Sequence, residues 1–266
     1  MSSRSSKFIE VFAVTLLACA SMVGATCVAA AQAWHKTGEE EGVVLETRDV
    51  PGMAMPEFRG TTVVNAGFYL VAAVLDDLDR YCEWQQRCVK AKEVSRISEL
   101  ERIFYSRTGA PWPLQDRDTV VHGKSVGLAE GQQAWVRFEA LTDTRWPPVS
   151  GVVRMPYVKG HWHLVRIDDS HTRVAFQVQA DPGGLVPAWA AKLSARQVPR
   201  DTLAGLRRQV AKSPSRYQAF LARWRDKSET PPAVTPQLQG SPDNSSPSST
   251  DPECALGYQR GFEAWY

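Results

Sequence analysis

The sequence has few cysteines and no excess of either charge. Its 266 residues include five cysteines, and 31 lysines and arginines are nearly balanced by 29 acidic residues. A net charge of +2 provides no concentrated basic surface, which argues against a nucleic-acid-binding protein. The apolar fraction of 43% and the charged fraction of 23% are ordinary for a globular protein.

The cysteine spacing predicts neither a disulfide framework nor a thiolate metal site. No C-x-x-C pair occurs, and removal of the N-terminal segment described below would leave Cys82, Cys88 and Cys254, an odd number. On a helix, Cys82 and Cys88 would lie too far apart to bridge. Unpaired thiols are therefore the main expectation, and a Cys82–Cys88 disulfide in an oxidising compartment is the alternative.

Only the N-terminus is hydrophobic enough to enter a membrane. Arg4 and Lys7 precede an apolar run, Val11–Ala33, that ends in the A-x-A cleavage site Ala31-Gln32-Ala33. These features predict a secretory signal peptide over residues 1–33 and a periplasmic or extracellular protein. Two alternatives stay open: the run is long enough for an uncleaved anchor, and Leu16-Leu17-Ala18-Cys19 resembles a lipobox that would place a lipid on Cys19.

Composition divides the remaining chain into a domain and a tail. Residues 34–227 carry regular apolar patterns and form the candidate domain. Residues 228–253 are rich in Pro, Ser, Thr and Asp, and bury too little apolar surface to offset the entropy of ordering. The whole tail, residues 228–266, is therefore predicted to be disordered.

Hydrophobic periodicity within the domain predicts an α+β fold. Helical patterns cover residues 34–41 and 67–84, and two strands cover 43–50 and 58–64. Seven further strands are expected over 89–97, 100–107, 117–126, 133–142, 149–157, 162–167 and 173–180. A long helix over 185–211, which Pro199 should kink or interrupt, and a last helix over 213–225 complete the domain.

The strand pattern predicts one curved antiparallel sheet. The connections are short, whereas parallel strands need long crossovers. Val136 and Phe138 share one strand face, and Val174 and Phe176 share another. Such one-sided apolar strands must bury that face, and the long C-terminal helix supplies the partner. Periodicity does not distinguish a solid interior from a hollow one.

Four stretches, in order, resemble one known family. Pro111–Asp118 is similar to the PWPL-x-x-RD segment of START (steroidogenic-acute-regulatory-protein-related lipid transfer) domains, and Asp181–Trp189 to their DPGG-x-x-P-x-W junction. Pro199 with Leu203, Leu206 and Arg207, and Val50-Pro51-Gly52 with Phe58-Arg59-Gly60, resemble further family segments. The resemblance covers roughly residues 34–225. It implies a helix-grip fold whose internal tunnel holds one lipid beneath a C-terminal lid helix.

The resemblance departs from the sterol-carrying members. These place a buried acid–base pair in the tunnel, at positions that fall near Phe104 or Tyr105 and at Gly123 of this sequence. Neither charge is present, which disfavours cholesterol. Fatty acids, phospholipids, carotenoids and other isoprenoids stay open as ligands.

The predicted lining of the tunnel is apolar and aromatic. It comprises Phe104, Trp112, Val136, Phe138, Val174, Phe176, Trp189 and Leu193. Arg117 and Asp118 are expected to be structural, because strand neighbours point to opposite faces. His161 and His163 share a strand face at the spacing of metal ligands, and Asp168, Asp169 and His171 follow closely, but two histidines near a turn are expected to face water. Gly183-Gly184 is expected to form a tight turn into the helix, not a phosphate site.

The leading functional prediction is a lipid carrier or sensor. We expect a monomer that contacts membranes transiently, with no catalytic residue, metal or cofactor. One alternative is an enzyme like the helix-grip polyketide cyclases and aromatases, with Tyr105, Arg154 or Tyr157 exchanging protons. The other is an envelope interaction module without a ligand, docking through the aromatic end of the tail.

Overall fold

The computed structural model describes residues 32–53, 55–142, 146–212 and 214–229. The elements are β1 (His35–Glu40), β2 (Val43–Arg48), β3 (Glu57–Val64), α1 (Phe68–Asp76), the 3-10 helix η1 (Leu78–Arg80), α2 (Tyr81–Trp84), β4 (Cys88–Ser98), β5 (Glu101–Thr108), β6 (Asp116–Val126), β7 (Gln133–Ala140), β8 (Val152–Arg154), β9 (Tyr157–Arg166), β10 (Thr172–Asp181), α3 (Ala188–Lys212), the 3-10 helix η2 (Pro214–Tyr217) and α4 (Gln218–Glu229). Residues 1–31 of the predicted signal peptide, and the predicted tail from residue 230, lie outside the described residues.

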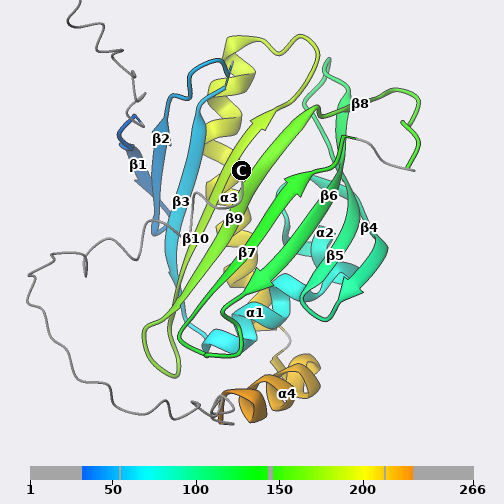
Figure 1. Ribbon diagram of the computed structural model, residues 1–266. Helices are drawn as coiled ribbons and strands as arrows, with labels where there is room; N and C mark the ends of the chain where they lie inside the picture. The colour runs from blue at the N-terminus through cyan, green and yellow to red at the C-terminus, as the bar shows by residue number, and fades with distance from the viewer. Residues whose placement is uncertain (1–31, 54, 143–145, 213, 230–266) are drawn as a thin grey trace, which may run out of the picture. The chain divides into compact units, whose positions relative to one another are not determined.

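The described strands form one ten-stranded sheet. Its order is β1-β2-β3-β10-β9-β7-β6-β5-β4, with β8 beside β6. Every pairing is antiparallel except that of β6 with β8. In Figure 1, α3 lies behind β3 and β10, and it packs against β2, β3 and β10. The predicted α+β helix-grip fold, a curved antiparallel sheet holding a C-terminal helix, is confirmed.

A glycine on β3 lets α3 approach the sheet. A Cβ on Gly60 would lie 2.8 Å from Leu203 Cδ1 and 2.9 Å from Pro199 Cβ, so any larger residue would push the helix away. Leu203 is fully buried in this contact. The interruption expected at Pro199 does not occur, since α3 is one helix from Ala188 to Lys212. Proline removes one backbone hydrogen bond, and the packing of this turn on β3 offsets that loss.

The helix predicted over residues 34–41 is wrong. This segment forms β1, which pairs antiparallel with β2. Glu41 and Gly42, which join the two strands, have φ values of 51° and 71°. Positive φ at both central residues is the geometry of a tight hairpin turn. Eight residues are also too few for a stable helix without tertiary packing, so strand pairing decides the conformation.

The single long helix predicted over residues 67–84 is instead three shorter helices, α1, η1 and α2. The turn that follows α2 allows a disulfide to form. The helix stops at Trp84, and Arg87, with φ of 54°, turns the chain back into β4. This turn brings the Cα atoms of Cys82 and Cys88 to 4.8 Å, and the two cysteines are bonded. The expectation of unpaired thiols is therefore wrong, because it assumed a continuous helix through both positions.

The strand predicted over residues 149–157 is much shorter than expected. Only Val152–Arg154 is a strand, β8, and it runs parallel to β6 at the sheet's margin. This pairing is the exception to the antiparallel expectation. Among the described residues, no helix has both the length and the apolar character needed to cross a membrane.

Candidate ligand-binding cavity

A cavity of about 310 Å³ lies between the inner face of the sheet, α2 and the N-terminal half of α3. Strands β5, β6, β7, β9 and β10 supply its floor, and Ala190, Leu193 and Val198 of α3 lie over it. This volume is at the lower end of the range for small-molecule sites, roughly 300–1,000 Å³. The cavity is where the curved sheet and α3 are not in direct contact.

Five of the predicted lining residues meet in this cavity. They are Phe104, Val136, Phe138, Phe176 and Leu193. Val174 is fully buried in the core but does not line the cavity, which covers β10 only from Phe176 onward. Trp112 and Trp189 also lie outside the lining and are 92% and 53% exposed. Alternation along a strand gives the buried face, but it does not show where along that face the helix lifts away.

The middle of the cavity has an aromatic wall that the sequence analysis did not single out. Trp162 on β9 stacks on Phe176 with ring centroids 4.3 Å apart, and its ring lies 5.8 Å from that of Trp84. Tyr81 meets Phe104 edge-on at 6.2 Å. Burial raises the pKa of the Tyr81 hydroxyl. Strand alternation could have identified Trp162, whereas Trp84 enters only because the chain turns after α2.

The charges at one end of the cavity are compensated within the protein. Arg102, at the start of β5, donates from Nη1 to the carbonyl oxygen of Asp76 at 2.8 Å and pairs with its carboxylate at 3.3 Å. Glu101 pairs with His122 at 2.7 Å and with Lys124 at 3.3 Å. These contacts, with that to His122 the strongest, hold the pKa of Glu101 below its usual value. No charge of this group needs a ligand.

Arg117 and Asp118 point to opposite faces of β6, as the alternation predicted. Arg117 lines the cavity. Asp118 is buried on the outer face, where Arg154 donates to its two carboxylate oxygens at 2.7 and 3.2 Å. Tyr105 lies on that face too, stacked on Trp146 with centroids 5.1 Å apart. Tyr105 and Arg154, two candidates for proton transfer, are therefore absent from the cavity lining, as is Tyr157.

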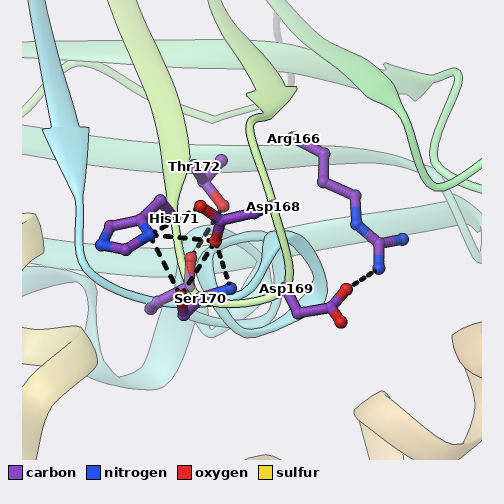
Figure 2. A network of polar contacts seen from close by, with 7 residues as sticks. Arg166, Asp168, Asp169, Ser170, His171 and Thr172 are labelled. Carbon is purple, nitrogen blue, oxygen red and sulfur yellow. Dashed lines mark hydrogen bonds and ion pairs between the residues drawn. The ribbon is translucent and has the colours of Figure 1, made fainter.

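The β9–β10 hairpin contains an aspartate, a serine and a histidine that are not a catalytic triad. Figure 2 shows Ser170 and Asp168 both directed at one nitrogen of His171, Nδ1, at 3.0 and 2.9 Å. A Ser-His-Asp relay uses the two different ring nitrogens. The hydrogen bond from the Ser170 backbone N–H, with those from His171 and the Ser170 hydroxyl, lowers the pKa of Asp168 to about 2. This exposed network stabilises the turn.

A serine motif also lies on β6. Gly123-Lys124-Ser125-Val126-Gly127 has the G-x-S-x-G spacing of a nucleophile elbow. A nucleophile elbow is a sharp turn from a strand into a helix. Here Ser125 lies within β6, and the chain continues through Gly127 into another strand, β7. The nearest histidine along the strand, His122, is occupied by Glu101. The motif has no base and no elbow.

His161 and His163 lie on the outer face of β9, next to Trp135 of β7. The His163 ring stacks on Trp135 with centroids 3.7 Å apart, and His161 meets the same indole at 4.8 Å. Burial, with a smaller effect of His163, lowers the pKa of His161 to about 4, so that ring is neutral at physiological pH. Within the described parts of the chain, no three His, Cys, Asp or Glu side chains are grouped to hold a metal ion.

Comparison with known proteins agrees with this geometry. The START domain family matches residues 22–212. The chain belongs to the START domain family. It is 30% identical over 199 residues to an uncharacterized protein of Pseudomonas aeruginosa, covering 75% of this chain and 96% of the other.

Solved START structures share the fold. A fragment of the STAR-related lipid transfer protein of Xanthomonas axonopodis has a TM-score of 0.61 at 32% identity, covering 67% of this chain and 99% of the fragment. Human STARD10 has a TM-score of 0.63 at 17% identity, covering 74% of this chain and 82% of its own, which is a similarity of fold. Membership of this family supports binding of a hydrophobic ligand.

In this START domain Phe104 and Gly123, the positions that correspond to the acid–base pair of the sterol carriers, lie side by side. Both Gly123 and Phe104 line the cavity, and a Cβ on Gly123 would lie 3.5 Å from Cε1 of the Phe104 ring. The aromatic ring covers the space that a side chain at position 123 would enter. The residue opposite Gly123 on β5 is Arg102, which also lines the cavity and pairs with Asp76.

Proposed function

We propose that this START domain binds one lipid or other apolar small molecule in the cavity, and carries or senses it outside the cytoplasm. The observation that carries the proposal is the aromatic cavity between the sheet and α3. Burial of an apolar ligand there is favourable by about 25 cal/mol per Å², before the cost of association is subtracted. Burial between the sheet and α3 shields such a ligand from water.

We also infer that the domain performs no covalent chemistry on its ligand. The candidate proton-transfer residues Tyr105, Arg154 and Tyr157 are absent from the lining. The serine motif on β6 has no base, and the Asp168–Ser170–His171 network shares a single ring nitrogen. These observations favour a carrier over the cyclase alternative.

Export from the cytoplasm is supported by the disulfide. A Cys82–Cys88 bond is typical of a protein that folds in an oxidising compartment. The START match begins at Met22, inside the predicted signal peptide, so the position of cleavage needs a direct measurement. An intact mass separates a chain that starts at Trp34 from one that carries a lipid on Cys19 or keeps the whole segment.

Transient contact with a membrane is supported by exposed apolar side chains beside the cavity. Trp112 and Leu185 are 92% and 95% exposed, and their chain neighbours Pro111 and Val186 line the cavity. Indole rings are well suited to the boundary between lipid and water. We expect flotation of the protein with liposomes to fall on Trp112→Ala; unchanged flotation contradicts this role for Trp112.

The proposed function is tested by native mass spectrometry of protein purified from its own host, with organic extraction of any bound molecule. We expect a lipid bound one to one, and its chemical class follows from the extract. A mass without ligand that stays unchanged after incubation with a mixed lipid extract would contradict the carrier proposal. That result would favour the interaction module.

A further inference from the structure

Buried polar atoms without a hydrogen-bond partner gather around the cavity. In the described part of the chain seven such side-chain atoms occur, and five belong to cavity-lining residues. These five are Trp84 Nε1, Gln85 Oε1, Gln86 Oε1, Arg117 Nε and Thr119 Oγ1. Folded proteins rarely leave buried polar groups unpaired, because each loses its hydrogen bonds to water. Gln85 Oε1 and Gln86 Oε1 only accept hydrogen bonds, whereas the other three atoms can donate. The three donors indicate groups that a ligand with acceptor oxygens satisfies.

Two of these atoms belong to a polar block on the floor of the cavity. Arg117 and Thr119 are two residues apart on β6 and so share its inner face. On β5 they are opposite Thr108 and Ser106, respectively, and all four side chains line the cavity. Thr119 is only 9% exposed, and its hydroxyl has no partner. A guanidinium N–H and a hydroxyl are thus presented together to whatever fills this end.

The turn after α2 borders the same end. The backbone N–H of Gly109, directly after Thr108, donates to the carbonyl oxygen of Arg87 at 2.8 Å. This contact places the segment that carries Trp84, Gln85 and Gln86 next to the end of β5. The indole of Trp84 is 5% exposed, and its N–H is one more unpaired donor of the lining.

The charged residues of the lining favour a negatively charged ligand group at the Thr108 end of the cavity. Its carboxylates, Asp76, Glu99 and Glu101, all lie at the opposite end, near Arg102. Arg102 and Thr108 are six residues apart on β5, which corresponds to about 20 Å. Near Thr108 the charged lining residues are Arg87 and Arg117. An anionic group therefore finds donors and positive charge there. The Asp116 carboxylate, next to Arg117 in the chain, is outside the lining and is paired with Arg107 at 2.6 Å.

We propose that this polar block, Ser106, Thr108, Arg117 and Thr119, holds the anionic oxygen headgroup of a single-chain lipid. The headgroup is a carboxylate or a phosphate, and it accepts hydrogen bonds from Arg117 Nε and the Thr119 hydroxyl. The chain lies along the aromatic wall toward Phe138 and Phe176. A cavity of about 310 Å³ suits one chain better than two. This inference rests on the proposed function, because it names the class of ligand for the same cavity.

The test compares three ligands that share one alkyl chain: dodecanoate, dodecyl phosphate and dodecanol. Calorimetric titration of the full chain should show at least one of the anions binding about 10- to 100-fold more tightly than the alcohol, as expected of hydrogen bonds to a charged group. The tighter anion identifies the headgroup as carboxylate or phosphate. In the variant Arg117→Gln/Thr119→Val the preference for the anion over dodecanol should fall to about twofold.

Arg173→Gln is the matched control, since it removes the same charge from the exposed outer side of β10; it should keep the full preference. If the double variant does not fold, Thr119→Val alone, which keeps the side-chain shape, should lower the preference by a smaller factor. Equal affinity of the wild type for all three ligands, or a preference retained in the variants, overturns the headgroup site and leaves the proposed function standing. No binding of any of the three, with a lipid nevertheless present in the native mass spectrum, overturns the headgroup site and leaves the proposed function standing. No ligand in either experiment contradicts both.

Discussion

Neighbouring residues on β6 have unrelated environments. Arg117 faces the cavity, whereas Asp118 is buried on the outer face with Arg154. Strand alternation predicts this separation from the sequence. It does not reveal that Arg117 faces an empty space or that Arg154 supplies the partner of Asp118, because both depend on segments distant in the sequence.

The ion pair between Arg154 and Asp118 should contribute strongly to stability. We expect Arg154→Met to lower the free energy of unfolding by about 3 kcal/mol, because it leaves the Asp118 carboxylate, with a side chain 1% exposed, buried without a counter-charge. Urea denaturation measures this change. Arg223→Met is the control: it removes an exposed ion pair with Glu99 and should cost less than about 1 kcal/mol. Equal effects of the two substitutions would contradict this account of Asp118.

At the scale of the elements, the packing of α2 on α3 requires their backbones to approach closely at Gly205. A Cβ on Gly205 of α3 would lie 2.1 Å from the carbonyl oxygen of Trp84. Glycine is a poor helix former, so the sequence alone gives no reason for it in the middle of α3. The contact explains it, and it also positions Trp84 at the cavity.

Gly205→Ala should therefore destabilise the protein, although helix propensity alone predicts a gain of about 1 kcal/mol. The added methyl group must displace α2, which we expect to cost about 1–3 kcal/mol, as overpacking does. It should also weaken ligand binding, since α2 carries Trp84. Thermal unfolding and a ligand titration measure the two effects. Gly38→Ala on β1, where a Cβ meets nothing within 4 Å, is the matched control; a stabilised Gly205→Ala variant would refute the close contact.

At the scale of the whole domain, the cavity and the packed core respond differently to added volume. Val136 lines the cavity, whereas Val174 is fully buried outside it. Both were predicted to line a tunnel, and apolar periodicity treats them alike. The difference arises from where α3 and α1 contact the sheet.

We expect Val136→Phe to abolish or greatly weaken dodecanol binding while changing the free energy of unfolding by less than about 1 kcal/mol, because the larger ring enters empty space. Val174→Phe has no such space and should cost about 1–3 kcal/mol. Calorimetry and urea denaturation of the two variants measure both quantities. Destabilisation of similar size in both would indicate that the interior around Val136 is solid.

The sequence by itself determined the order of most elements, the antiparallel sheet and the family, because these depend on local periodicity and on motifs that are short in the chain. It also placed Phe104, Val136, Phe138, Phe176 and Leu193 on the strand and helix faces that meet in the cavity. The errors at β1 and at the cysteines arose where strand pairing or a single turn overrode local preference.

Only the tertiary structure decided where the interior is hollow and which polar groups face it. Helix α3 contacts the sheet at Gly60 of β3, and its own Gly205 contacts α2. The turns of α3 that precede these contacts stand away from the strands, and the cavity lies beneath them. The unpaired atoms of Trp84, Arg117 and Thr119 meet there from segments that are distant in the sequence. Packing between distant segments sets these distances, and local periodicity contains no information about them.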